Sequence, residues 1–173
     1  MPREKKTVAK SFRIDEDALE MLRDEAQYQK MSLNTLVNQL VVNYANFGRY
    51  AKRVHTLVLS RETVSELISP LTEDEIAKAG QNSARDIPRE WMLLVDGKIA
   101  VSSVIHFIHN LSSYTNWFEY TEKNQGEHWT ITLMHEMGRK WSLFIAHHIN
   151  AAFAAAGCQP KYDIADQYVT FAV

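Results

Sequence analysis

The first 47 residues constrain the fold most, because their apolar faces are larger than one copy of the segment can bury. Residues 7 to 14 alternate between apolar and polar side chains, with Val8, Phe12 and Ile14 on one face and Lys10 as the one interruption. A period of two predicts a short, half-buried strand.

Two amphipathic helices are expected to follow this strand. Asp15 is a suitable N-cap for a helix to about Gln29, and Ser32 for a second helix ending near Asn46 or Gly48. A strand and two helices in about 45 residues leave apolar side chains uncovered on one side, so we expect a second copy to cover them.

This segment resembles the ribbon-helix-helix DNA-binding domain of the Arc, MetJ and CopG repressors. The resemblance covers residues 7 to 47, and it rests on the strand, on Arg13 before the first helix and on the Ser-x-Asn sequence that opens the second helix. The chain departs from the family at Lys30, where such domains often carry glycine in the turn between the helices. The resemblance implies a homodimer through residues 7–47 that lays an antiparallel β-ribbon in the major groove of double-stranded DNA.

The same resemblance assigns candidate site residues. The solvent face of the strand would contact bases, and Arg13 on that face can form a bidentate pair with guanine. The exposed amides and the positive dipole end at the start of the second helix would bind phosphate, together with the basic N-terminal residues. The base-contacting candidates are Thr7, Ala9, Ser11 and Arg13, and the phosphate-contacting candidates are Lys5, Lys6, Ser32, Asn34 and Thr35.

The distribution of charge agrees with a polyanionic partner for the N-terminal part. Residues 1 to 53 contain ten Lys and Arg against seven Asp and Glu, whereas residues 54 to 173 contain nine against fourteen. The basic excess near the N-terminus favours a nucleic acid there, and the acidic remainder favours a different role.

We expect two domains, 1–50 and 54–173, joined by a basic stretch over 48–53. The second domain is predicted to be α+β, with several helices and an antiparallel sheet. Its expected elements are a strand at 54–59, helices at 60–68, 72–84, about 90–94, 99–117 and 138–156, a hairpin of 118–122 with 128–134, and strands at 162–164 and 168–172.

No catalytic motif is present, so we expect no enzyme activity and no cofactor. The single Cys158 has no paired base, and the seven histidines lack the spacing of a metal site. If the second domain binds a small-molecule effector, the aromatic side chains favour a place between the helix ending at Trp117 and the sheet.

The expected function is that of a sequence-specific DNA-binding transcriptional regulator, with repression as the expected mode. The acidic domain would sense an effector or join dimers into a dimer of dimers. An antitoxin and an architectural DNA-binding protein are the alternatives, although antitoxin tails are usually short and an architectural protein would favour a basic second domain. The charged N-terminus and the lack of a long apolar run predict a cytoplasmic protein without a membrane partner.

Overall fold

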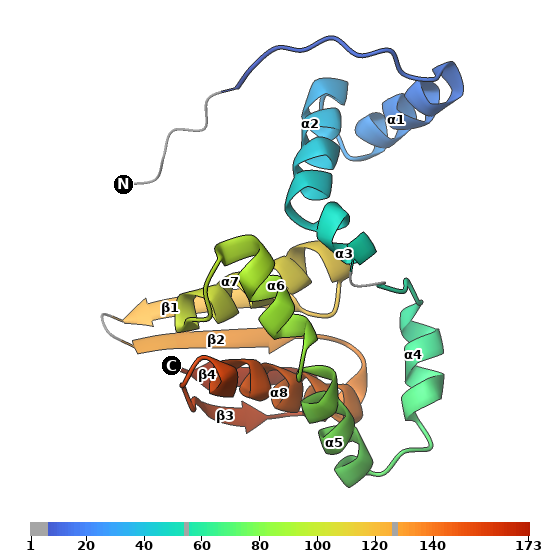
Figure 1. Ribbon diagram of the computed structural model, residues 1–173. Coiled ribbons are helices and arrows are strands. Elements are labelled where there is room, and N and C mark those ends of the chain that lie inside the picture. Colours follow the sequence, from blue (N-terminus) through green and yellow to red (C-terminus); the bar gives the residue numbers. More distant parts are fainter. Residues whose placement is uncertain (1–6, 54–55, 126–127) are drawn as a thin grey trace. The chain divides into compact units, whose positions relative to one another are not determined.

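The structure is a computed structural model that describes residues 7–53, 56–125 and 128–173. The chain divides into two compact units, Met1–Gly48 and Arg49–Val173, hereafter unit 1 and unit 2 (Figure 1).

Unit 1 contains the two helices expected from the sequence. Helix α1 spans Glu16–Tyr28, and the carboxylate of Asp15 accepts a hydrogen bond from the Ala18 amide at 3.4 Å. Helix α2 spans Leu33–Asn43 and continues into a π-helical turn, Tyr44–Gly48. Between the helices Lys30 has a φ of 54°, so a lysine occupies the left-handed conformation that glycine usually supplies.

The prediction of an N-terminal strand is wrong, and the resemblance to ribbon-helix-helix domains, which depends on that strand, is wrong too. Residues 7–15 have no regular secondary structure, and all the strands of the described chain lie in unit 2. Alternating side chains do not make a strand by themselves, because a strand needs a neighbour to accept and donate its backbone hydrogen bonds. The ribbon-based contact with the major groove therefore loses its structural basis.

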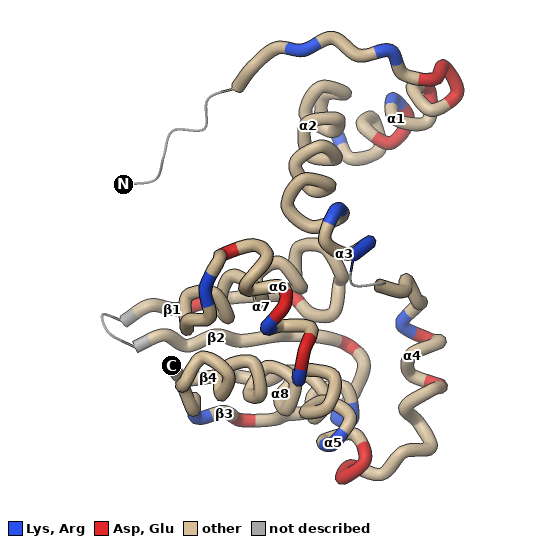
Figure 2. The backbone as a smooth tube through the Cα atoms, in the orientation of Figure 1, with Lys and Arg blue, Asp and Glu red and all other residues tan. Residues whose placement is uncertain are grey.

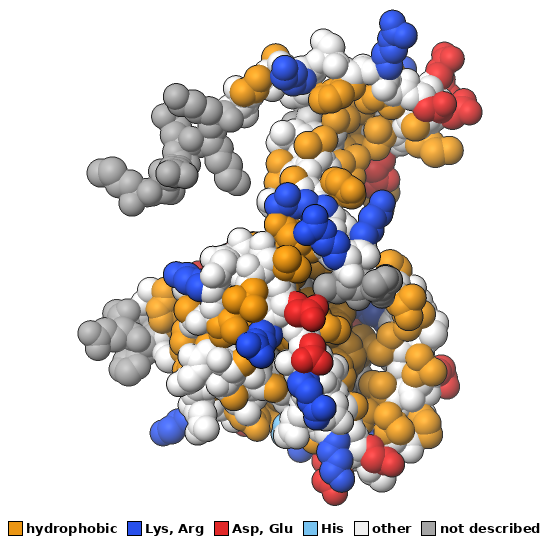
Figure 3. Space-filling view, viewed as in Figure 1, with side chains coloured by type: hydrophobic (Ala, Val, Ile, Leu, Met, Phe, Trp, Pro, Cys, Tyr) orange, Lys and Arg blue, Asp and Glu red, His pale blue; other side chains and the backbone are white. Residues whose placement is uncertain are grey.

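Unit 1 buries very little of its own apolar surface. Among its described residues only Ala26 and Leu36 are buried, whereas Val8 and Phe12 are 78% and 76% exposed. Apolar side chains also lie exposed along α2, including Leu40 and Val41 (Figure 3). One copy of this unit therefore lacks a core of ordinary size.

Unit 2 is α+β. Its helices are α3 (Arg49–Arg53), α4 (Arg61–Ile68), α5 (Glu73–Ser83), α6 (Ile87–Asp96), α7 (Val101–Thr115) and α8 (Gly138–Ala155). Sequence signals placed the starts of α4 and α5 well, because Ser60 caps α4 and Thr72 forms a capping box with Glu75.

The strand expected at 54–59 is also wrong for the residues that the structure describes. Residues 54 and 55 lie outside them, and 56–60 have no regular structure and are exposed. The apolar side chains of Leu57, Val58 and Leu59 favour a strand, but no strand of the sheet pairs with this segment.

The sheet consists of two hairpin-like pairs. Strands β1 (Glu119–Gln125), β2 (His128–Met134), β3 (Lys161–Ile164) and β4 (Tyr168–Ala172) pair antiparallel in the order β1-β2-β4-β3. Thr132 lies opposite Thr121 on one side and Thr170 on the other, which fixes the register.

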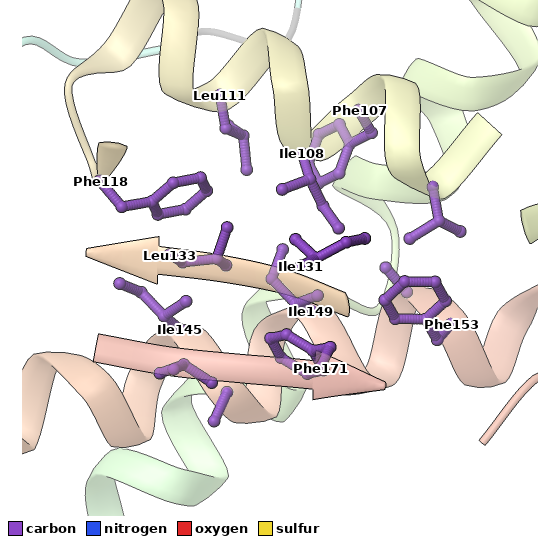
Figure 4. Close-up of a cluster of buried hydrophobic side chains, with 14 of the residues drawn as sticks. Phe107, Ile108, Leu111, Phe118, Ile131, Leu133, Ile145, Ile149, Phe153 and Phe171 are labelled. Atoms are coloured by element: carbon purple, nitrogen blue, oxygen red, sulfur yellow. The ribbon is translucent and has the colours of Figure 1, made fainter. Parts of the chain in front are cut away.

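The core of unit 2 lies on the side of the sheet that α7 and α8 cover. Figure 4 shows side chains of both helices directed toward those of β2 and β4. The members labelled there are Phe107, Ile108, Leu111, Phe118, Ile131, Leu133, Ile145, Ile149, Phe153 and Phe171, all buried. The opposite face of the sheet carries the threonine row of Thr121, Thr132 and Thr170, which is exposed or half-buried.

Helix α5 packs closely on α8 through Gly80. A Cβ at this position would lie 2.6 Å from the Phe144 carbonyl oxygen and 3.1 Å from the Cβ of His147. Next to this contact the hydroxyl of Ser83 donates to the Gly80 carbonyl at 2.9 Å, and Nδ1 of His148 lies 2.8 Å from the same hydroxyl oxygen.

The neighbours of His148 determine its protonation. Because the single Ser83 hydroxyl proton goes to Gly80, Nδ1 of His148 must carry a proton and donate it to Ser83. The neutral ring then has no proton on Nε2, which is buried without a hydrogen-bond partner among the described residues. Burial lowers the pKa of His148 to about 4, although the Gly80 backbone opposes the shift.

This arrangement predicts that acid destabilises unit 2. Between the ordinary histidine pKa of 6.5 and about 4, the unfolded chain binds a proton that the folded chain does not, so the stability falls as the pH is lowered through that window. His135 acts in the same direction, since burial, and secondarily the charge of Arg61, lowers its pKa to about 4. We expect the melting temperature to fall between pH 7 and pH 5, and to fall less in His148→Phe.

The control for this prediction is His109→Phe, because His109 is exposed on α7. It should keep the wild-type dependence of the melting temperature on pH. Equal pH dependences in His148→Phe and the wild type would contradict the assignment of this effect to His148.

Candidate nucleic-acid interface

The segment of residues 7–14, hereafter the arm, presents every one of its side chains to solvent. It has no secondary structure and leads directly into the N-cap of α1. Lys10 and Arg13 are its charged residues, and neither has an ion-pair partner among the described residues. Thr7, Ala9 and Ser11 are exposed beside them, while Lys5 and Lys6 lie outside the described residues.

The start of α2 is the second part of the candidate interface. The Ser32 hydroxyl oxygen accepts a hydrogen bond from the Thr35 amide at 3.1 Å and lies 2.7 Å from the Thr35 hydroxyl oxygen. The structure thus brings these two predicted residues together, in a capping role. Asn34 lies between them in the sequence and is exposed at the helix N-terminus, where amides and the helix dipole favour an anion.

Charge is segregated within unit 1. All the acidic residues between positions 7 and 48 lie from Asp15 to Glu25, at the cap and along α1, whereas the arm and α2 contain none. Figure 2 shows this separation as blue on the arm and red at the start of α1. The arm and α2 are therefore the parts of unit 1 whose charge favours a polyanion, whereas α1 disfavours one.

One histidine–serine pair of unit 2 has the spacing of a catalytic pair but not its proton arrangement. His135 and Ser142 are buried, with Nε2 2.9 Å from the serine hydroxyl oxygen, a geometry that superficially resembles a catalytic pair. Nδ1 of His135 accepts a hydrogen bond from the Met137 amide at 3.2 Å, so Nε2 carries the proton and donates it to Ser142. The ring cannot remove the serine proton in this tautomer, and the pair stabilises the turn between β2 and α8.

Two further histidines, His106 and His109, also make structural contacts. His106 pairs with Asp96 at 2.9 Å, and the ring of His109 packs edge-on against Tyr120. The described residues contain no group of three His, Cys, Asp or Glu side chains placed to hold a metal ion.

The aromatic side chains between α7 and α8 contact one another closely. Trp141 stacks on Phe144 with ring centroids 5.0 Å apart, and Trp117 lies edge-on to both. An open hollow of about 410 Å³ instead lies beside α4, where Ser65 and Ile68 face Met137 and Arg139. At the place near Trp117 where we expected an effector site, the rings thus pack on one another, and the hollow lies elsewhere.

Sequence reasoning named the arm and the start of α2 but missed the confinement of acidic residues to α1. The signal was present in the sequence, since residues 26–48 contain no Asp or Glu. The helix limits are needed to see that this acid-free stretch includes the whole of α2, while the acidic residues belong to α1 and its cap.

Among the described residues no single helix is long and apolar enough to cross a membrane. The stretch from α5 to α6 reaches that length and composition only together with α7, across a bend of 103°.

No protein-family model, curated protein sequence or solved structure matches this chain.

Proposed function

We propose that this chain is a DNA-binding regulatory protein that acts as a dimer and contacts duplex DNA through the arm and the start of α2. The observation that carries the proposal is the charge segregation in unit 1: the arm with Lys10 and Arg13 is exposed, and neither it nor α2 contains an acidic residue. Lys5 and Lys6 add positive charge to the same end of the sequence. Such a surface favours phosphate contacts, and these are strongly salt-dependent.

Arg13 is the residue proposed to give sequence preference. Its guanidinium can donate two parallel hydrogen bonds to guanine, whereas Thr7, Ala9 and Ser11 offer weaker or less selective contacts. Lys10, Ser32, Asn34 and Thr35 are proposed to hold the DNA backbone, which positions the arm without reading sequence.

The decisive experiment compares Arg13→Ala with Arg23→Ala on a selected high-affinity duplex and on random duplex. Both variants lose one positive charge from unit 1, but Arg23 lies within the acidic helix α1. We expect Arg13→Ala to weaken specific binding by about 1–3 kcal/mol at each contacted site, and random binding much less. Arg23→Ala should leave both affinities close to wild type.

Duplex selection with the two variants provides the outcome that can overturn this proposal. The base preference at one position should become degenerate in Arg13→Ala alone. The base-reading role of Arg13 is excluded if its variant returns the wild-type motif with equal losses on all sequences. Absence of salt-dependent binding by the wild-type chain would exclude the DNA-binding function itself.

The exposed apolar surface of unit 1 supports the dimer. Val41 is 57% exposed on α2, on the same helix stripe as Leu40 and Tyr44. Burying such side chains against a second copy contributes about 25 cal/mol per Å² of apolar area. We expect Val41→Asp to weaken self-association of the full chain in sedimentation experiments.

The control is Val58→Asp, which places the same charge on a side chain that is 96% exposed in unit 2. It should leave the association constant near the wild-type value. A monomeric wild-type chain at micromolar concentration would contradict the proposed dimer.

A further inference from the structure

Strand β1 is an edge strand, because among the described residues no strand pairs with its second side. It pairs only with β2, while β3 forms the opposite edge of the sheet. Such an edge presents a row of backbone amides and carbonyls that can accept another strand.

The sequence of β1 is complementary to itself in the antiparallel direction. If Thr121 of one copy lies opposite Thr121 of another, Glu119 lies opposite Lys123 and Tyr120 lies opposite Glu122, each pair occurring twice by symmetry. Opposite charges directly across two strands stabilise their pairing.

Both faces of the strand fit this register. Glu119, Thr121 and Lys123 are exposed on the open face of the sheet, so the two ion pairs would form there. On the helix-covered face Tyr120 donates a hydrogen bond to Glu122 within one chain. In the paired register each Tyr120 hydroxyl would also meet the Glu122 carboxylate of the second copy.

Neighbouring registers lack this complementarity. A shift by one residue pair in one direction places Glu122 opposite Glu122, and in the other direction it places Glu119 opposite Thr121. Charges on an edge strand usually prevent pairing. In β1 they favour the register centred on Thr121, repel each other in the one centred on Glu122, and form no ion pair in the one centred on Tyr120. The other edge strand, β3, has four residues against seven in β1; a register centred on Tyr162 would place Lys161 opposite Asp163, but over a shorter ladder.

We propose that unit 2 pairs with a second copy of this chain through β1, and that the two four-stranded sheets join into one antiparallel sheet centred on Thr121. This contact goes beyond the proposed association and DNA binding of unit 1, and it depends on residues of unit 2 only. Its failure would therefore leave the proposal for unit 1 unchanged.

Site-directed disulfide formation in the full chain tests the register. Residues directly opposite in an antiparallel pair have Cα atoms about 4.5–5.5 Å apart, within the range of a disulfide. Thr121→Cys, in a Cys158→Ser background that removes the native thiol, should form a covalent dimer under mild oxidation. The matched control is Asp163→Cys in the same background, since Asp163 is exposed in the same cross-sheet row at the other edge. Equal yields at the two positions would overturn the proposal.

Charge exchange in the Thr121→Cys background tests the ion pairs. Glu119→Lys or Lys123→Glu alone turns both attractive pairs into repulsive ones, so we expect the protein concentration for half-maximal cross-linking to rise roughly tenfold or more. The double variant Glu119→Lys/Lys123→Glu restores opposite charges and should restore the yield. An equimolar mixture of the two single variants should form the mixed dimer preferentially. Single and double variants that cross-link equally, or a mixture without preference, would overturn the proposed register.

Discussion

Replacing Phe153 by alanine should lower the free energy of unfolding of unit 2 by about 3–5 kcal/mol. Phe153 is fully buried on α8, and its ring lies 6.0 Å from that of Phe171 on β4. Removing the ring deletes contacts on both the helix and the sheet, and the surrounding residues can fill the space only in part. Urea unfolding followed by tryptophan fluorescence measures the loss, because Trp91 and Trp141 belong to the same core.

Phe12→Ala is the matched control, because it removes the same ring from a side chain that is 76% exposed in the arm. It should change the unfolding free energy of unit 2 by less than about 0.5 kcal/mol. A loss below about 1 kcal/mol in Phe153→Ala would show that the core around this residue is packed differently.

Gly80→Leu should destabilise unit 2 by about 3 kcal/mol or more, with Gly80→Ala showing a smaller loss of about 1–3 kcal/mol. The first added carbon already meets the backbone of α8 at 2.6 Å, and backbone atoms cannot rotate away as a side chain can. Helix α5 must then move outward. This movement also exposes Ile76, the large side chain that α5 buries together with Gly80.

Lys78→Leu provides the comparison, because it introduces the same side chain at an exposed position of the same helix. Its unfolding free energy should stay near wild type. A wild-type stability in Gly80→Leu would contradict the close approach of α5 and α8.

Local signals in the sequence predicted the helices of this protein well. Asp15, Ser32, Ser60 and Thr72 each combine a capping side chain with an apolar period of 3.6, and each begins a helix in the structure. The hairpin of β1 and β2 was also expected, since turn residues separate two alternating segments. These features depend on neighbours within a few residues.

The two errors concern segments whose structure depends on distant partners. Residues 7–14 and 56–59 have the composition of strands, yet neither pairs with another strand in the described chain. A single sequence shows the preference for an extended backbone but not whether a second strand is present. The same limit applied to the candidate site. The sequence was enough to name its individual residues, but the assignment of the neighbouring acidic residues to one helix, α1, depends on the helix limits in the structure.

The order of strands in the sheet also affects how the protein folds during its synthesis. Strand β4 lies between β2 and β3, although it follows every other element of unit 2 in the sequence. A ribosome releases the chain from its N-terminus, so β1, β2 and α8 emerge while the strand that occupies the centre of the sheet is still in the exit tunnel. Ile131 and Leu133 of β2 then lack Val169 and Phe171, their cross-strand neighbours among the buried residues. Unit 2 should consequently remain incompletely folded until residues 168–172 have emerged, with its apolar surface open to chaperones during that interval.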